Sequence, residues 1–261
     1  MFPHHEAAIA RTVARFESEP TVLGLLLGGS IAHGFETEAS DVDVMLVVSD
    51  EEFDGRLARL DTAFSDVELA GYVDGYIDAK YVSPAYLRLV AERGSEPARF
   101  AFSDARVLFS RVDGLAELVS EAAHYPVETR DDHIARFAAQ VEAWRWYAGE
   151  AERKGDPYLL STAVSRLALF AGRMLLAHNE TLYPFHKWFL RVLDQAPLKP
   201  DAVVELIRDL TSNPTAAKAE HLADLVLAFH EWDRGGVDWP NQFMFDTEQS
   251  WIRDAAALEE L

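Results

Sequence analysis

The chain has 261 residues, of which 49% are hydrophobic and 26% charged, values typical of a folded protein with one large domain or two small ones. It contains no cysteine, which excludes a disulfide framework, a thiolate metal site and a cysteine nucleophile. The formal net charge of −20 disfavours a long polynucleotide as partner, because nucleic-acid binding relies on Lys and Arg to neutralise phosphates.

The first half of the chain alternates apolar runs of strand type with helical patterns. A long apolar run ends in glycine at 28, and a second begins directly after a pair of acids near 41. In chain order the pattern predicts a helix over 5–17, a strand over 21–28, a strand over 41–48, a helix over 51–63 with Phe53, Leu57 and Leu60 on one face, one or two strands within 66–82, a helix over 85–93, a strand over 105–110 and a helix over 114–123.

The second half of the chain shows helical patterns and no strand-like runs. Asp156-Pro157 and Asn213-Pro214 each have the N-cap and proline that often begin a helix. Helices are predicted over 131–154, 157–177, 201–210, from 214 to Gly235-Gly236, and over 247–260. The expected fold class is therefore α+β, with an N-terminal mixed-sheet domain over residues 1–125 and a helical bundle over 126–261.

One stretch, LLLGGSIAHGFETEASDVDVMLVV, combines features that suggest chemistry. A strand ends in Gly28-Gly29-Ser30, and the next strand opens with Asp41-Val42-Asp43. Because side chains alternate along a strand, Asp41 and Asp43 share one face, with their backbones about 6–7 Å apart. Two such acids can converge on divalent cations, while the glycines and Ser30 can approach a phosphate closely.

The order of these features resembles the nucleotidyltransferase superfamily of DNA polymerase β, in which Gly-Ser precedes Asp-x-Asp by about a dozen residues. Gly29-Ser30 and Asp41-x-Asp43 match that pattern, and Ala32, Gly34 and Ser40 agree with its common extended form. The resemblance implies a Mg²⁺-dependent enzyme that uses a nucleoside triphosphate, with ATP expected, in which Asp41 and Asp43 are catalytic metal ligands and Gly29 and Ser30 hold the phosphates.

The match has one departure. Many relatives carry Arg or Lys directly after the Ser and again two residues later, whereas this chain has Ile31 and His33. We expect His33 to be a solvated loop residue, with contact to phosphate as the alternative. The departure bears on how tightly the triphosphate is held and not on the expected fold.

The superfamily usually has a third acid on a neighbouring strand, which completes the metal site and can act as base toward the attacking hydroxyl. Asp78 is the first candidate for this catalytic and metal-binding role, because alternation in the run 76–82 places it on one strand face with Lys80. Asp74 and Glu68 remain rivals, since the sequence does not fix the strand register.

The second half resembles the helical domains of the small aminoglycoside and lincosamide nucleotidyltransferases, which implies a substrate-binding role for residues 126–261. Lys187, among aromatic residues in the segment 182–189, is the candidate that could reach the triphosphate from this half. The alternative is an aromatic anchor that packs the bundle, with a solvated Lys187.

The expected reaction is transfer of a nucleoside monophosphate to a hydroxyl of a small molecule, an antibiotic being one candidate. Two alternatives stay open: nucleotidylation of a protein side chain, as in toxin–antitoxin relatives, and a non-catalytic nucleotide-binding module. The N-terminus has no apolar run of signal-peptide length, and the stretches 22–27 and 167–177 fall short of a membrane span. We expect a cytoplasmic protein with no membrane or nucleic-acid partner.

Overall fold

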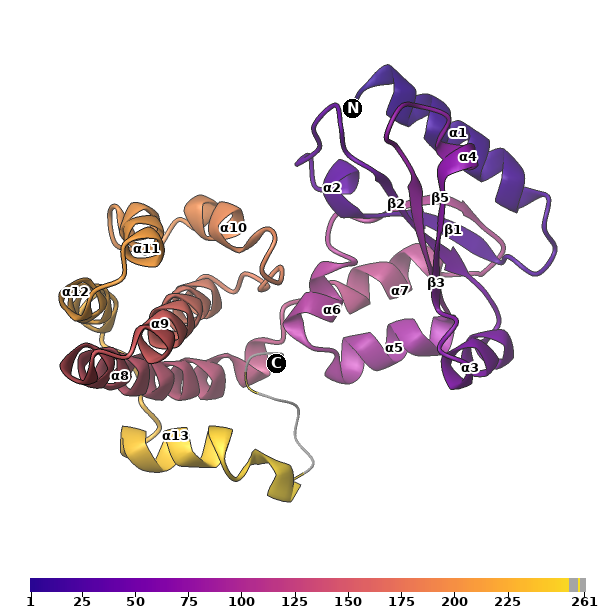
Figure 1. Ribbon diagram of the computed structural model, residues 1–261. Coiled ribbons are helices and arrows are strands. Elements are labelled where there is room, and N and C mark those ends of the chain that lie inside the picture. The colour runs from indigo at the N-terminus through magenta and orange to yellow at the C-terminus, as the bar shows by residue number, and fades with distance from the viewer. Residues whose placement is uncertain (254–257, 259–261) are drawn as a thin grey trace. The chain divides into compact units, whose positions relative to one another are not determined.

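The structure is a computed structural model that describes residues 1–253 and Leu258 (Figure 1). It divides into two compact units, residues 1–124 and residues 125 onward. The first unit has a five-stranded mixed sheet with helices around it, and the second is helical throughout its described part. The predicted α+β class is confirmed.

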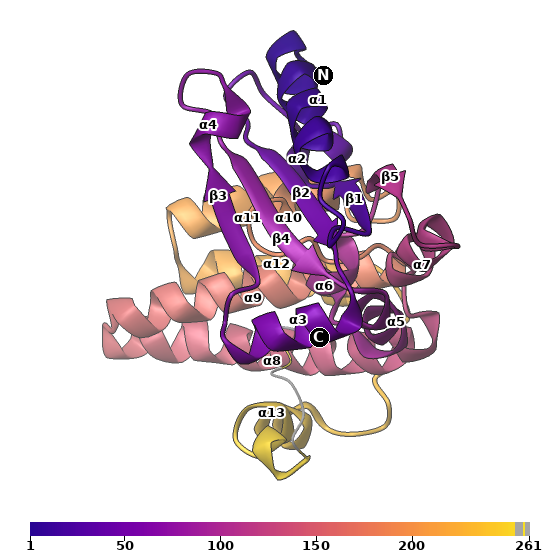
Figure 2. The ribbon, with the colours of Figure 1, turned by 90° about the vertical axis from the view of Figure 1, so that its right-hand side faces the viewer.

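The sheet of the first unit has the strand order β3-β4-β2-β1-β5, which can be followed in Figure 2. β2 and β4 run parallel, while the other neighbouring pairs are antiparallel. β1 and most of β2 are buried on both faces, as their continuous apolar sequences predict. The strands are β1 (Gly24–Leu27), β2 (Val42–Val47), β3 (Ala63–Asp66), β4 (Ile77–Val82) and β5 (Arg106–Ser110).

Two helical layers cover the two faces of this sheet (Figure 1). Val44 and Leu46 of β2 belong to the core under α1 and α4, whereas Met45 and Val47 belong to the core under α5 and α7. Because side chains alternate along β2, this one strand contributes apolar side chains to both cores. The helices are α1 (Pro3–Glu17), α2 (Gly29–Ala32), α3 (Asp50–Ala58), α4 (Val67–Ala70), α5 (Pro84–Arg93), α6 (Glu96–Phe100) and α7 (Leu115–Ala122).

The predicted helix over 51–63 is too long. α3 begins after the N-cap Ser49 and ends at Ala58, and Leu60 then takes a left-handed φ of 56° before β3 starts. Only Phe53 of the three residues expected on one apolar face is buried, while Leu57 and Leu60 are exposed. β3 is a short edge strand that buries little, so it lacks the apolar signal that would have marked the boundary.

The predicted strand region 66–82 contains a helix. The side chain of Asp66 accepts a hydrogen bond from the Leu69 amide, and this N-cap begins α4. Gly71 ends α4 in the left-handed conformation, with φ of 65°, and β4 starts only at Ile77.

The second unit is built around two long antiparallel helices, α8 and α9, whose predicted ranges agree with the structure to within one residue at each end. α12 begins after the N-cap Thr215 and ends at Leu227, well before the predicted Gly235-Gly236, and the indole N–H of Trp232 then donates to the Val226 carbonyl. The helices are α8 (Arg130–Lys154), α9 (Pro157–His178), α10 (Phe189–Gln195), α11 (Val203–Ser212), α12 (Ala216–Leu227) and α13 (Trp239–Thr247), with short 3-10 helices at Val127–Thr129 and Ser250–Arg253.

The helix predicted over 247–260 is wrong at its start, because Thr247 is the last residue of α13 and a 3-10 turn follows at Ser250–Arg253. Pro240, at the second position of α13, begins a helix that the sequence pattern did not mark. The remainder of the predicted range, apart from Leu258, lies outside the described residues.

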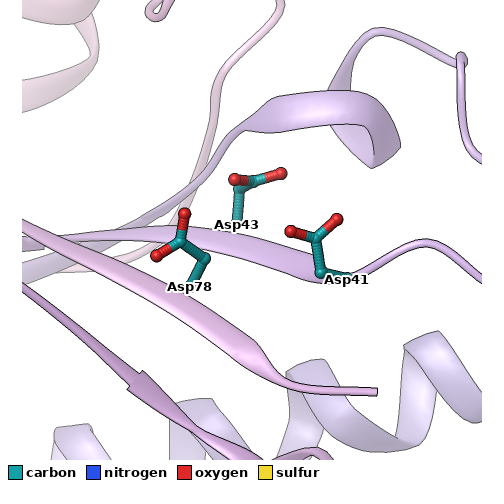
Figure 3. Close-up of side chains that lie close together, drawn as sticks. All are labelled: Asp41, Asp43 and Asp78. Atoms are coloured by element: carbon teal, nitrogen blue, oxygen red, sulfur yellow. The ribbon is translucent and has the colours of Figure 1, made fainter. Parts of the chain in front are cut away.

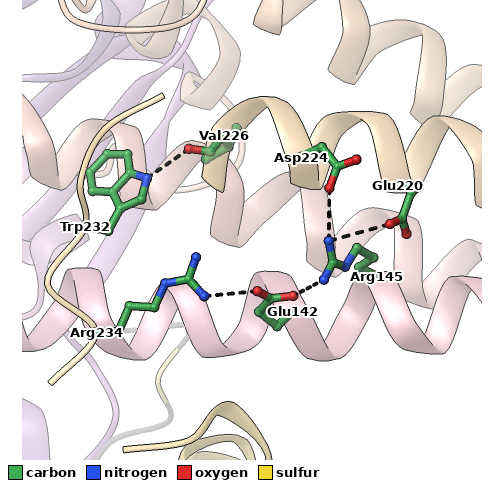
Figure 4. Close-up of polar contacts among 7 residues, drawn as sticks. All are labelled: Glu142, Arg145, Glu220, Asp224, Val226, Trp232 and Arg234. Atoms are coloured by element: carbon green, nitrogen blue, oxygen red, sulfur yellow. Dashed lines mark hydrogen bonds and ion pairs between the residues drawn. The ribbon is translucent and has the colours of Figure 1, made fainter. Parts of the chain in front are cut away.

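Ion pairs link α8 to α12 and to the segment that follows it (Figure 4). Arg145 of α8 contacts Asp224 at 3.1 Å and Glu220 at 3.6 Å, both on α12. Glu142 of α8 accepts from Arg145 and, at 3.1 Å, from Arg234. The outer partners Glu220, Asp224 and Arg234 are exposed, and exposed ion pairs contribute about 0.2–1 kcal/mol each.

α9 is the one helix, within the residues the structure describes, that is long and apolar enough to cross a membrane by length and composition. It exceeds the apolar stretch 167–177 seen in the sequence. Its most apolar window is 67% buried inside the structure, as is usual for the central helix of a globular bundle.

Candidate metal centre and phosphate loop

Three carboxylates meet on one face of the sheet, at the starts of β2 and β4 (Figure 3). Asp41 directly precedes β2, Asp43 is its second residue, and Asp78 is the second residue of β4. The parallel register pairs Asp43 with Asp78. One oxygen from each of the three lies within 4.8 Å of the others, and all three residues are half-buried. Like charges this close repel one another, and a divalent cation among them relieves that repulsion.

The two rivals of Asp78 lie elsewhere. Glu68 is in the first turn of α4, which packs against α1. Asp74 is exposed in the loop before β4, with a left-handed φ of 58°. Among the described residues, Asp41, Asp43 and Asp78 are the one group of three or more side chains arranged to hold a metal ion. The register of β4 is what brings Asp78 to the other two acids.

Gly29 allows the loop after β1 to pass directly against Asp43. The Gly28 amide donates to the Asp43 carbonyl at 3.0 Å, and Gly29 has φ of 60°. A Cβ atom at position 29 would lie 1.7 Å from Oδ2 of Asp43 and 2.2 Å from its Cγ. Only glycine fits between this backbone and this carboxylate, so the two halves of the sequence motif are in direct contact.

Ser30 follows in α2 and is 4% exposed. Its Oγ is buried and has no hydrogen-bond partner among the residues the structure describes. A buried hydroxyl without a partner is costly, and such exceptions often mark a place where a ligand supplies the missing bond. An oxyanion beside α2 would provide it.

His33 is not the solvated loop residue that the sequence led us to expect. Its side chain is only 4% exposed, its ring stacks on Phe100 at 4.5 Å, and its Nδ1 lies 3.1 Å from Oδ2 of Asp104. Arg106 of β5 donates to the carbonyl of Ile31 at 3.3 Å, which puts a guanidinium beside the loop. No local sequence pattern indicates this contact, because 75 positions separate Arg106 from Ile31.

Tyr76 borders the acids. A hydrogen bond to Asp41 raises the pKa of its hydroxyl, and the negative charges of Asp41, Asp78 and Asp43 raise that pKa further. The phenol is therefore a donor to the carboxylate over the whole neutral range. Tyr76 is 38% exposed, so solvent screens part of this effect.

We expect Asp41→Asn to lower the pKa of Tyr76, because the amide keeps a hydrogen-bond acceptor but removes the adjacent negative charge. An alkaline NMR titration of ring-labelled tyrosine would show the Tyr76 signal titrating at lower pH in the variant. An Asp74→Asn variant, which changes an acid that none of these causes includes, is the control. An unchanged Tyr76 titration in Asp41→Asn would contradict the described contact.

Lys187 lies in the second unit, in the segment between α9 and α10. It is exposed, and its Nζ is 5.1 Å from the ring centre of Trp188. Leu182 and Tyr183 of the same segment are buried, so this part of the segment anchors the bundle. A role of Lys187 in binding a triphosphate stays a prediction.

No protein-family model matches the chain, and no curated protein matches it. Several solved structures are similar to the chain, among them a nucleotidyltransferase-like protein from Exiguobacterium sibiricum. The two are 14% identical with a TM-score of 0.47, over 96% of this chain and 80% of the other. Similarity of this degree establishes neither a family nor a function.

Proposed function

We propose that this protein is a Mg²⁺-dependent nucleotidyltransferase that moves a nucleoside monophosphate, AMP from ATP, to a hydroxyl of a small molecule. One observation carries the proposal: three carboxylates from two adjacent parallel strands gather beside a glycine-serine loop whose buried hydroxyl has no partner among the described residues. The spacing of Gly29-Ser30 and Asp41-x-Asp43, which resembles that of the polymerase β superfamily, supports the same reading.

Asp41, Asp43 and Asp78 would hold the metal. Carboxylate oxygens are the ligands that Mg²⁺ prefers, and Mg²⁺ usually completes its shell with water and substrate phosphate. Bound there, the ion would neutralise charge on the phosphates and orient them for displacement. Three carboxylates that each offer an oxygen within 4.8 Å of the others fit this role.

Ser30, Arg106 and Asp78 would each have a further role in the reaction. Ser30 would donate its unpartnered hydroxyl to a phosphate oxygen, and Arg106 would supply positive charge beside a loop that has no Arg or Lys between Ser30 and Asp41. Asp78 would accept the proton of the attacking hydroxyl. The charge of −20 favours a small acceptor over a polynucleotide.

The direct test is incubation with isotopically labelled triphosphates, Mg²⁺ and a panel of hydroxylated small molecules, followed by mass spectrometry of both the small molecules and the protein. A product heavier by one nucleoside monophosphate, with release of pyrophosphate, is the expected result. The mass of the protein fraction reports transfer to a protein side chain. Failure of any triphosphate to bind in the presence of Mg²⁺ would overturn the proposal.

Ser30→Ala should weaken triphosphate binding without weakening the fold. A hydrogen bond to a charged phosphate contributes roughly 1.5–3 kcal/mol, which corresponds to about ten- to a hundredfold in affinity. The free energy of unfolding without ligand should not fall, because the Oγ removed makes no hydrogen bond in the described residues. Calorimetric titration with ATP and Mg²⁺ measures the affinity. Unchanged affinity would mean that the loop does not hold the phosphate.

A further inference from the structure

The first unit contains an apolar pocket of about 360 Å³ that the metal centre does not use. Its walls come from β2, β3 and β4 of the sheet and from α3, α5 and the α6 region. The side chains that define its character are Met45, Phe53, Leu57, Lys80, Tyr86 and Phe102. This volume lies within the range of pockets that bind small ligands.

The pocket begins next to the three carboxylates. Met45 pairs with Lys80 in the parallel register, two residues after the pair Asp43 and Asp78. Because side chains alternate, both pairs project from the same face of the sheet, with their backbones about 6.6–6.8 Å apart along the strands. A bound molecule can therefore lie over Met45 and Lys80 and still reach Asp78.

The glycine-serine loop and the strands that line the pocket occupy different parts of the sheet. In the order β3-β4-β2-β1-β5, the loop follows β1 and contacts Arg106 of β5, whereas the pocket is lined by β2, β4 and β3. Phosphoryl transfer places the attacking and leaving oxygens roughly in line. With the leaving pyrophosphate on the side of Ser30, the attacking hydroxyl comes from the side of Asp78, where the pocket lies.

The chemistry of the pocket favours a flat apolar molecule. Phe53, Tyr86 and Phe102 supply aromatic walls, and burial raises the pKa of the Tyr86 hydroxyl, which keeps it a donor. Lys80 is exposed, and its side chain makes no ion pair or hydrogen bond within residues 1–253 and 258, so its ammonium group is available to a ligand. The chain has five lysines against 44 acids, and Lys80 is one of the residues that line this pocket.

We propose that this pocket binds the acceptor, and that the acceptor is a flat, ring-containing alcohol or phenol with an anionic group that pairs with Lys80. A polycationic amino sugar would bind poorly here, because its positive charges would be repelled by the Lys80 ammonium group and would face apolar walls. The inference rests on the proposed function. In the step, the acceptor oxygen forms a bond to the α-phosphorus, the bond from that phosphorus to the bridging oxygen breaks, pyrophosphate leaves, and the hydroxyl proton passes to Asp78.

The first measurement needs no turnover. The probe is 8-anilino-1-naphthalenesulfonate, an aromatic anion, titrated by fluorescence against the folded full-length protein. Ala63→Phe would fill the pocket from the exposed edge strand β3, and Lys80→Met would remove the cation. We expect one site in the wild type, loss of that site in Ala63→Phe, and about tenfold weaker binding in Lys80→Met. Ala10→Phe, on the exposed surface of α1, and Lys154→Met, which removes the same charge from α8, should bind as the wild type does.

The second measurement links the pocket to the reaction. Pyrophosphate release from ATP and Mg²⁺ should be stimulated by anionic phenols, and the probe should inhibit competitively with the phenol. Ala63→Phe should lose this stimulation while its calorimetric affinity for ATP with Mg²⁺ stays unchanged. If the wild type transfers the nucleotide to an amino sugar and Ala63→Phe retains that activity, the inference about the pocket is wrong, while the proposed function stands. Wild-type protein that binds no triphosphate would overturn the proposed function, and the acceptor role with it.

Discussion

Asp41→Asn and Asp43→Asn are each expected to lower the rate of nucleotidyl transfer by at least about 10³-fold. Each variant removes one charged oxygen ligand from a cluster whose oxygens lie within 4.8 Å of one another. Metal ions stabilise the charge of a transition state by several kcal/mol, and about 4 kcal/mol corresponds to roughly a thousandfold in rate. The fold should persist, because both residues are half-buried and lie at the start of β2.

Without metal, the same variants should be at least as stable as the wild type, because one of three neighbouring negative charges is gone. Thermal melts without and with Mn²⁺ measure this: the ion should raise the melting temperature of the wild type but not of the variants. Asp74→Asn is the matched control, since Asp74 is exposed outside the cluster. Near-normal turnover of either variant in Mg²⁺ would rule out the metal centre.

Gly29→Ala is expected to abolish transfer nearly as completely as Asp43→Asn. The new methyl group would overlap the Asp43 carboxylate at 1.7 Å, so Asp43 has to leave its position or the loop has to move. The left-handed φ of 60° adds about 1–2 kcal/mol, and the overlap about 1–3 kcal/mol, to the loss of folding stability.

Gly34→Ala distinguishes the effect of the left-handed backbone from the effect of the overlap with the Asp43 carboxylate. Gly34 lies in the same loop with φ of 68°, but a Cβ atom there would meet nothing within 4 Å. It should lose about 1–2 kcal/mol of stability from the backbone alone and keep its metal affinity and activity. Urea unfolding and Mn²⁺ calorimetry on both variants make the comparison. Equal loss of metal affinity in the two would mean that Gly29 acts only through its backbone conformation.

Strongly patterned elements could be predicted from the sequence, and weakly patterned ones could not. The apolar runs of β1 and β2 and the long amphipathic helix α8 have signals that cover most of their length. The short helices α4 and α6 depend on single N-cap side chains, Asp66 and Ser95, which a periodicity does not register. The end of α12 is set by the chain turning back at Trp232, a tertiary effect.

At the candidate site, the spacing of residues predicted the acids of β2 and the phosphate loop as candidates, because they lie within one short stretch. The choice among Asp78, Asp74 and Glu68 required the strand register, which a sequence with several nearby acids leaves open. The contacts of Tyr76 with Asp41 and of Arg106 with Ile31 join separate segments of chain. No local pattern reports such contacts.

The parallel pairing of β2 with β4 also affects how the chain reaches its native state. Asp43 and Asp78 are register partners, yet they stand 35 positions apart in the sequence, and parallel strands cannot be joined by a tight turn. The intervening chain forms α3, β3 and α4, and β3 pairs with β4 as a neighbouring antiparallel strand. Loop-closure entropy delays pairings of this kind during folding. The three carboxylates therefore come together when the sheet closes, so their mutual repulsion opposes a late step of folding, which divalent cations should accelerate.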